Sequence, residues 1–297
     1  MSIPEYQLDT WSHQGSITQS SATYAAIKRV LEDSSTLYKG KDYYVFLQGS
    51  YGNDTNIYAE SDVDIVIQLN DCFQHDLTTL TDPEKELFNQ CHHNAAYTHV
   101  DFKRDVLTVL GDAFGKDVKA GDKAIKIVAN AGRRNADVIA AVQYRRYYKF
   151  SGIYDQRFDE GICFYDSSGQ KIANYPRQHS KNLTKKHQLA EQWLKPMVRI
   201  LKNMRSKLVE AKMIKDGCAP SYYIEGLLYN VPEDKFGGSY ADSFVECIKW
   251  IQQADRAKFV CANEQYKLLW EDSPVTWRTD KCDEFLKALV KLWNDWA

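Results

Sequence analysis

The feature that most constrains this chain is the stretch 48–69, where a glycine-serine pair precedes an Asp-x-Asp sequence and an apolar run. Residues alternate from Asp62, as they do in a strand that buries one face. Such a strand carries Asp62 and Asp64 at the head of one face. The other face is wholly apolar and consists of Val63, Ile65, Ile67 and Leu69. The pattern predicts a strand that packs on a core and presents two carboxylates at its start.

Two carboxylates this close repel each other unless a cation compensates them. Mg²⁺ prefers one or two carboxylates together with phosphate and water oxygens, so the pair suits a metal-bound nucleotide. Just upstream, an apolar strand is expected over 43–47. Gln48, Gly49 and Ser50 follow it as candidate nucleotide-binding residues, of which Gly49 and Ser50 supply a small backbone and a hydroxyl for phosphate oxygens. A glycine-serine pair alone is a common turn, and an Asp-x-Asp sequence alone is more often a solvated strand end. Together, their order and spacing resemble the signature of the nucleotidyltransferase fold shared with DNA polymerase beta.

A third carboxylate, Asp137, stands at the head of another apolar run that begins at Ala136. It shares a strand face with Ile139, Ala141 and Gln143. The alternative is an aspartate that merely ends the turn at Arg133 and Arg134. Because Asp62 and Asp64 already require a partner, we interpret Asp137 as the third metal ligand and the general base.

Composition limits the classes of protein to which the chain can belong. It has 297 residues, 44% of them hydrophobic, which is enough for a substantial core. The formal charge of -2 supplies no global field for nucleic acid. The seven cysteines form no Cys-x-x-Cys pair, which predicts reduced thiols. With no apolar signal core and no membrane-length apolar window, we expect a soluble, cytoplasmic protein with no membrane partner.

The remaining patterns predict an α+β protein with a mixed sheet, followed by an all-helical C-terminal domain. We place the nucleotidyltransferase core at 1–178 and the helical domain, which closes the nucleotide cleft, at 179–297. Strands are expected at 43–47, 62–69, 123–129, from 136, and as a hairpin within 159–173. Helices are expected at 19–33, 82–91, around 102–110, 184–213, from 221, near 240–254 and near 280–295, with 70–98 otherwise irregular.

Three further patterns have both a functional and a plain structural interpretation. The histidines of Cys91-His92-His93 and His99 lack zinc-type spacings, so we expect them to be solvated. Residues 144–149 mix tyrosines with cations, as single-stranded nucleic-acid platforms do, but we favour an outer strand with a solvated face. Lys195, Arg199 and Lys202 form a helical stripe that suits a triphosphate or, as is usual for such stripes, only solvent.

Taken together, the sequence resembles the CD-NTases, bacterial relatives of animal cyclic GMP-AMP synthase and oligoadenylate synthase. The resemblance covers about residues 20–230. Its motifs are Gly49-Ser50-Tyr51, Thr55-Asn56, Ser61-Asp62-Val63-Asp64-Ile65, the Asp137 strand, the helix from Lys195 to Lys202 with Arg199, and Ser221-Tyr222.

The resemblance implies a function for several of these residues. In the family, the three aspartates hold two Mg²⁺ ions, for which Mn²⁺ is the alternative, and the glycine-serine turn holds the donor triphosphate. Carried over, Lys202 and Ser221 contact phosphates and Tyr222 stacks on a base. The chain lacks the zinc insertion of the animal enzyme and a dense basic surface, so activation by double-stranded DNA is not expected. Regulatory or effector proteins of a defence operon are the implied partners.

The implied reaction is the template-independent synthesis of a cyclic di- or oligonucleotide second messenger from nucleoside triphosphates (NTPs), in anti-phage signalling. The stretch 174–182 resembles one in a clade with pyrimidine-using synthases, where an asparagine selects uracil; Asn174 and Asn182 are the two candidates. A linear 2′-5′ oligonucleotide synthase, or a transferase that adds one nucleotide to RNA or protein, would use the same triad. A binding module with a degenerate triad is disfavoured by the three intact aspartates.

Overall fold

The computed structural model describes residues 2–15, 17–58, 62–271, 273 and 275–296. The chain divides into two compact units, each built from separate stretches of sequence. The sheet unit consists of Thr18–Gln48 and Asp62–Pro176. The helical unit consists of Met1–Ile17, Gly49–Ser61 and Arg177–Ala297. Two N-terminal stretches therefore belong to the same unit as the C-terminal helices, and the domain division at residues 178 and 179 stays a prediction.

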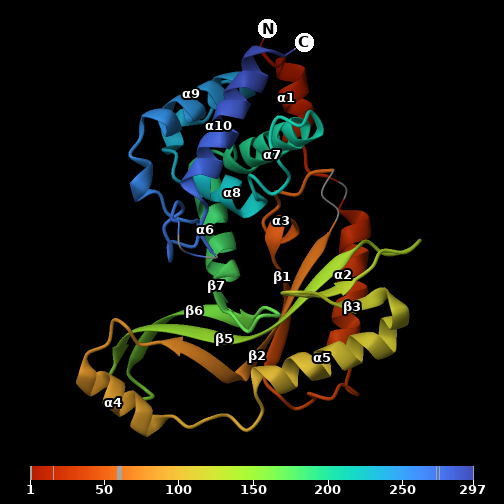
Figure 1. Cartoon of the computed structure of the whole chain (residues 1–297), viewed down its shortest axis with the longest axis vertical. Helices are drawn as coiled ribbons and strands as arrows, with labels where there is room; N and C mark the ends of the chain where they lie inside the picture. Colours follow the sequence, from red (N-terminus) through yellow and green to blue (C-terminus); the bar gives the residue numbers. More distant parts are fainter. Residues whose placement is uncertain (1, 16, 59–61, 272, 274, 297) are drawn as a thin grey trace. The chain divides into compact units, whose positions relative to one another are not determined.

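In the described residues of the sheet unit, seven strands form one mixed sheet (Figure 1). Its main order is β1-β2-β5-β4-β3, and β6 and β7 continue from another part of β5. Among the described strands of this sheet, β2 and β5 form the only parallel pair, and β5 is flanked by β2 and β6 along residues 143–146. The strands are β1 (Tyr43–Leu47), β2 (Val63–Asp76), β3 (Val118–Ala120), β4 (Ile125–Ile127), β5 (Ala136–Phe150), β6 (Gln156–Tyr165) and β7 (Lys171–Asn174).

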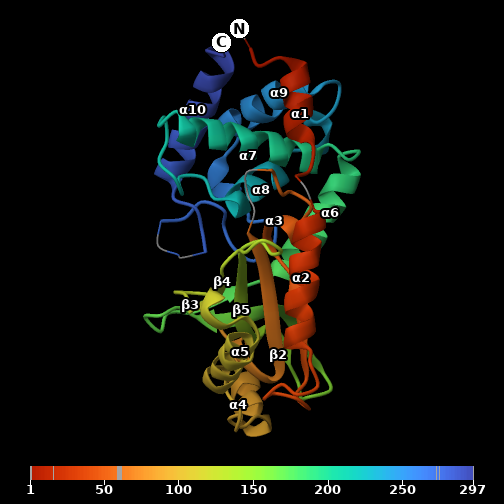
Figure 2. The same ribbon diagram turned by 90° about the vertical axis from the view of Figure 1, so that its right-hand side faces the viewer.

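Three α-helices support the sheet: α2 (Thr18–Leu31), α4 (Asp82–Cys91) and α5 (His99–Phe114), with a short 3-10 turn, η1 (Gly115–Asp117), after α5 (Figure 2). Helices α2 and α5 pack against each other and against β2, whereas α5 and α4 both pack on β5. Both faces of β2 are buried over its first half: Val63, Ile65, Ile67 and Leu69 on one face and Val66 on the other are all fully buried.

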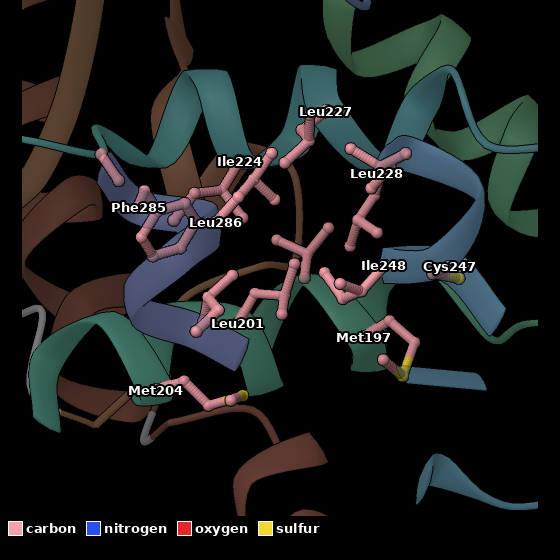
Figure 3. Close-up of a cluster of buried hydrophobic side chains, with 14 of the residues drawn as sticks. Met197, Leu201, Met204, Ile224, Leu227, Leu228, Cys247, Ile248, Phe285 and Leu286 are labelled. Carbon is pink, nitrogen blue, oxygen red and sulfur yellow. The ribbon is translucent and has the colours of Figure 1, made fainter. Parts of the chain in front are cut away.

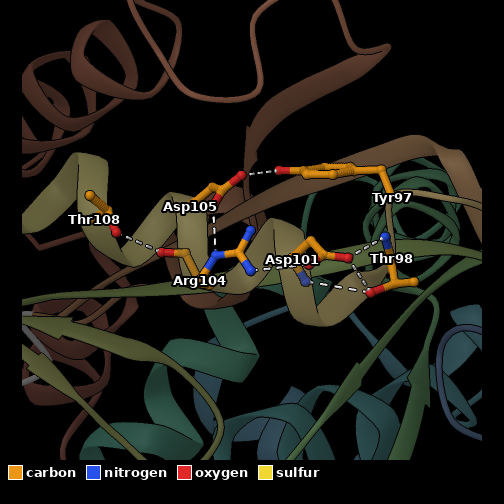
Figure 4. Close-up of polar contacts among 6 residues, drawn as sticks. All are labelled: Tyr97, Thr98, Asp101, Arg104, Asp105 and Thr108. Carbon is orange, nitrogen blue, oxygen red and sulfur yellow. Dashed lines mark hydrogen bonds and ion pairs between the residues drawn. The ribbon is translucent and has the colours of Figure 1, made fainter.

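Helix α5 begins at a capping box that the sequence encodes locally (Figure 4). Thr98 and Asp101 exchange hydrogen bonds across the first turn, which satisfies amide groups that a helix start leaves unpaired. One turn later, Asp105 accepts a hydrogen bond from the Tyr97 hydroxyl at 2.7 Å and pairs with Arg104. These contacts fix the start of the helix that packs on β5.

The helical unit is organised around α7 (Leu194–Glu210), which packs on α1 (Glu5–Ser12), α8 (Ser221–Tyr229), α9 (Tyr240–Gln253) and α10 (Thr279–Asn294). Its remaining elements are α3 (Gly49–Gly52), α6 (Pro176–Leu189), η2 (Glu233–Lys235) and η3 (Arg256–Lys258). Figure 3 shows the core where α7, α8, α9 and α10 meet, with Met197, Leu201 and Met204 projecting from α7. These three side chains are fully buried, as their helical spacing predicts.

Most predicted elements are confirmed, and the differences have identifiable causes. Strand β2 continues to Asp76, so residues 70–76 belong to a strand and not to the irregular segment that was expected. The pairing register of β2 with β5 shifts between Leu69 and Phe73, and the strand then pairs with β5 as far as Asp76. Residues 144–146 lie on an inner strand, so the prediction of an outer strand is wrong there. His99 is buried and bonds the Ala140 carbonyl at 3.0 Å, so it is not solvated as expected.

All seven cysteines lie in described parts of the chain and are free thiols. Among the described helices, none is both long enough and apolar enough to cross a bilayer.

Candidate active site

The sheet places two of the predicted aspartates side by side. Strands β2 and β5 run parallel, and Asp64 on β2 lies directly opposite Asp137 on β5. Each aspartate is the second residue of its strand. Asp62 is exposed and precedes β2 by one residue instead of belonging to the strand. Because the neighbouring strands run in the same direction, both strand starts bring their carboxylates to one edge of the sheet.

The electrostatics of Asp137 follow from this placement. Burial raises the pKa of its carboxyl, Lys126 on the neighbouring β4 opposes that rise, and the negative charge of Asp62 adds to it. Such a carboxyl is held closer to a proton-accepting role than an exposed aspartate is. The charge of Asp62 therefore acts on Asp137, although Asp62 lies outside the strand.

The aspartates also offer suitable donors for a divalent ion. No group of three His, Cys, Asp or Glu side chains in the described ranges is arranged as a complete metal site. Carboxylate oxygens on neighbouring strands are nevertheless the donors that Mg²⁺ takes when substrate phosphates and water supply its other ligands. The residues therefore fit an ion that binds together with a triphosphate.

The predicted glycine-serine turn is the start of a one-turn helix, α3, that follows β1 after a single residue, Gln48. The Gln48 amide donates to the Asp64 carbonyl at 3.0 Å, so the hydrogen bonding between the two chain segments continues one residue beyond the end of β1. Gly49 has a φ of 63°, in the left-handed region where a Cβ would strain the backbone. In the helical unit, α3 packs beside α8, which begins at Ser221.

The predicted cationic stripe of α7 holds a loop of the same unit. Lys202 is fully buried and donates to the Thr55 carbonyl at 2.9 Å. Lys195, only 6% exposed, pairs with the Asp54 carboxylate at 2.9 Å, and Arg199 donates to the Asp54 carbonyl at 2.6 Å. Asp54 itself has a φ of 57°, which is uncommon outside glycine. The stripe is therefore not a solvated face; it stabilises a strained loop that follows the glycine-serine turn.

Ser221 and Tyr222 lie in the first turn of α8 and are both half-buried. The Arg205 guanidinium donates to the Ser221 hydroxyl at 3.2 Å. The Tyr222 ring stacks on His179 of α6, with ring centroids 4.7 Å apart, and its hydroxyl accepts from Asn263 at 2.9 Å. The two residues that the resemblance assigns to phosphate and base are thus held by neighbours within their own unit.

The two candidate asparagines have different surroundings. Asn174 ends β7, and its side-chain oxygen accepts from the Tyr175 amide at 2.8 Å. Asn182 lies inside α6 and donates to the Ala262 carbonyl at 2.9 Å. Asn182 therefore does not cap a helix, because α6 already begins at Pro176. The assignment of either asparagine to base selection stays a prediction.

The quoted motifs leave out a buried carboxylate in the helical unit. Glu225 is 2% exposed and accepts hydrogen bonds from Asn53, Thr55 and His179. A glutamate inside the apolar run 223–228 is a sequence signal for a buried, paired charge, since an ionised carboxylate is rarely buried alone. Ser61, quoted with the Asp-x-Asp motif, lies outside the described residues.

Comparison with known proteins identifies the class to which this fold and site belong. Residues 181–294 match the model of the cGAS/DncV-like nucleotidyltransferase C-terminal helical domain. Cyclic UMP-AMP synthase of Rhodothermus marinus is 40% identical over the whole of both chains, and cyclic nucleotide synthase CdnE01 of Staphylococcus haemolyticus is 36% identical, again over the whole of both. The chain belongs to the CD-NTase family and is a nucleotidyltransferase.

Solved structures agree with this assignment. The Rhodothermus marinus c-UMP-AMP synthase, determined with Apcpp and Upnpp, matches with a TM-score of 0.89 and 38% identity over 99% of this chain and 98% of that one. The Elizabethkingia meningoseptica cyclic dinucleotide synthase, determined with GTP and Apcpp, matches with a TM-score of 0.77 and 28% identity over 98% of both chains. The predicted α+β nucleotidyltransferase fold with a helical C-terminal part is confirmed.

Proposed function

We propose that this enzyme joins two or more NTPs into a cyclic oligonucleotide with release of pyrophosphate, and that Asp62, Asp64 and Asp137 form its catalytic centre. The observation that carries the proposal is the pairing of Asp64 with Asp137 at the starts of parallel strands. Relatives of full length that are 32–40% identical are named as synthases of cyclic nucleotides, which supports a cyclic product.

In the proposed reaction, a ribose hydroxyl of one nucleotide attacks the α-phosphorus of another. A new P–O bond forms, the bond between the α-phosphorus and the β-phosphate oxygen breaks, and pyrophosphate leaves. Asp137 accepts the proton of the attacking hydroxyl, a role that its raised pKa favours. Repetition of the step within one linear intermediate closes the ring.

Asp62, Asp64 and Asp137 would hold the two divalent ions expected from the resemblance, Mg²⁺ or alternatively Mn²⁺. When bound, such ions neutralise the carboxylates and the charge on the triphosphate. Gly49 and Ser50 would contact the triphosphate through the backbone and hydroxyl that begin α3.

We infer further that UTP is among the substrates. The relatives differ in the bases they use: the Rhodothermus marinus protein is a UMP-AMP synthase, whereas a protein from Elizabethkingia meningoseptica, 32% identical, is a dipurine synthase. The greater identity to the first relative favours a product that contains UMP. As the resemblance implies, this product would serve as a second messenger in anti-phage signalling and act on effector proteins.

The decisive experiment incubates the protein with the four NTPs and Mg²⁺ and identifies the products by chromatography and mass spectrometry. We expect a cyclic product that contains uridine, and its loss with EDTA. Asp64→Asn should reduce the rate at least about 100-fold, because it removes charge stabilisation at the reacting centre. Asp71→Asn is the matched control, since Asp71 is an exposed aspartate on the same strand. Linear products would instead support the alternative synthase, and full activity of Asp64→Asn would refute the assigned centre.

A further inference from the structure

The most unusual polar group in the helical unit is the Glu225 carboxylate in the second turn of α8. Its Oε2 accepts from Asn53 Nδ2 at 3.0 Å and from His179 Nε2 at 2.7 Å, and its Oε1 accepts from the Thr55 hydroxyl. Burial opposes its ionisation, but the hydrogen bond and charge of His179, with Lys202 and Thr55, outweigh burial and lower its pKa. An ionised carboxylate is therefore kept where almost no solvent reaches it.

Burying an ionised carboxylate is costly, and hydrogen bonds to both of its oxygens are needed to offset that cost. The three donors come from two segments that are far apart in sequence, the loop 53–55 and α6. The loop contains Asp54 in a strained left-handed conformation. Strain of this kind persists only where the surroundings over-determine it, and it occurs often at functional sites.

His179 connects this carboxylate to the start of α8. Its ring lies against Tyr222 at an interplanar angle of 23°, and its Nε2 donates to Glu225 one helical turn further along. Its other nitrogen, Nδ1, is buried with no hydrogen-bond partner among the described residues. A phenylalanine would stack equally well without burying an unpaired nitrogen. The histidine is thus favoured for its hydrogen bond to Glu225 and not only for the stack.

We propose that Glu225 and His179 form a positioning pair that fixes the loop after the glycine-serine turn relative to the Ser221-Tyr222 helix start, and so sets the geometry in which a nucleotide is bound. The inference rests on the proposed function, because it takes both segments to contact the substrate. Neither residue needs to contact the nucleotide. The pair acts through the backbone of residues 53–55 and through the ring of Tyr222.

Two substitutions of His179 separate its hydrogen bond from its ring. His179→Phe keeps a ring against Tyr222 and removes the donor, whereas His179→Gln keeps an N–H donor and removes the ring. Glu225→Gln removes the charge without changing the shape. Glu233→Gln is the control, because Glu233 pairs with Lys186 of the same α6 at 2.8 Å but is 45% exposed.

The measurement is the affinity of each full-length variant for the non-hydrolysable triphosphates Apcpp and Upnpp with Mg²⁺, by calorimetry, together with the melting temperature without ligand. We expect Glu225→Gln and His179→Phe to lose about tenfold in affinity, as for one lost charge-assisted hydrogen bond. His179→Gln should lose at most half as much binding free energy as His179→Phe. Glu233→Gln should bind like the wild type.

Each other outcome refutes the proposal. If His179→Phe binds within twofold of the wild type, or if His179→Gln is the weaker binder, the hydrogen bond does not position the site. A fall in melting temperature with unchanged affinity would make the pair purely structural. If Glu225→Gln does not fold, the two His179 variants still decide. Failure of the wild type to bind either analogue would overturn the proposed function as well, whereas equal binding by all variants overturns this inference alone.

Discussion

At the residue scale, two kinds of carboxylate matter to the proposed function: three aspartates at or just before the starts of β2 and β5, and the buried Glu225 of α8. The Asp-x-Asp spacing marks Asp62 and Asp64, and the position of Asp137 at the head of an apolar run marks the third. Glu225 was missed because its donors lie 46 to 172 residues away. No local pattern specifies which distant groups meet a buried carboxylate, even though the glutamate itself stands out in an apolar run.

Asp137→Asn tests how much the buried charge of Asp137 lowers the stability of the fold when no metal is bound. Because the folded pKa of Asp137 is raised, its favourable contribution is complete below the unfolded value, near 3.9, and is lost as pH rises through the folded value. In EDTA at pH 7 the variant should therefore melt at a higher temperature than the wild type. This gain should vanish below about pH 4, where both states are protonated.

Added Mg²⁺ with Apcpp should reverse that order, since only the wild type keeps all three ligands. Thermal melting across pH with and without Mg²⁺ is the measurement. A less stable Asp137→Asn at pH 7 in EDTA would mean that its carboxylate is stabilised by protein partners instead.

The asparagines give a second prediction at this scale. At least one of Asn182→Ser and Asn174→Ser should lower UTP incorporation relative to ATP, because an amide that pairs with a base edge discriminates by roughly 1 to 3 kcal/mol. Asn182→Ser also removes a hydrogen bond to Ala262, so a stability loss of about 1 kcal/mol is expected in either case. Product ratios from a UTP and ATP mixture decide; unchanged ratios in both variants would make the asparagines structural.

At the element scale, strongly patterned segments were predicted well and context-dependent ones less so. Helix α4 has the predicted bounds, Asp82 to Cys91. Helix α6 begins at Pro176, eight residues before the predicted 184, because proline is favoured in the first turn and His179 and Leu183 bury one face. In the sequence, a histidine and a leucine four residues apart do not by themselves predict a buried helix face. Their burial depends on the segments that pack against α6. The same holds for the inner position of β5.

The cations of α7 can be ranked by their burial and partners. Lys202→Met should raise the KM for ATP about tenfold, because it removes a fully buried ammonium that bonds the Thr55 carbonyl and lies beside Glu225. Lys195→Met should change KM less, since its partner Asp54 has a side chain that is 63% exposed. Steady-state kinetics of both variants provide the comparison. A larger effect at Lys195 would show that the wrong lysine was assigned.

At the scale of the whole molecule, the sequence predicted the fold class and the helical C-terminal part, but not that two N-terminal stretches join that part. Helix α1 buries Leu8 and Trp11 in the same core as α7, and the segment just before α1 adds Ile3. Trp11 meets Trp296 edge to face at 5.4 Å, near the other end of the chain. No local sequence pattern predicts a contact between residues that lie so far apart in the chain.

This architecture predicts unequal effects along α1. Leu8→Ala should lower the free energy of unfolding by about 2 to 5 kcal/mol, because Leu8 is fully buried. Tyr6→Ala should change it by less than about 0.5 kcal/mol, since Tyr6 is 73% exposed. Denaturant unfolding of the full chain measures both. Equal effects would show that α1 is not part of the core that α7 organises.

The membership of α1 in the helical unit also has a consequence for biosynthesis. A ribosome delivers α1 long before the helix against which it packs, because α7 begins only at Leu194. The sheet unit ends at Pro176 and can complete its strand pairing while the later helices are still being translated. Throughout that interval α1 lacks the helix that covers its apolar side chains, so chaperones that bind apolar segments would meet this protein at α1.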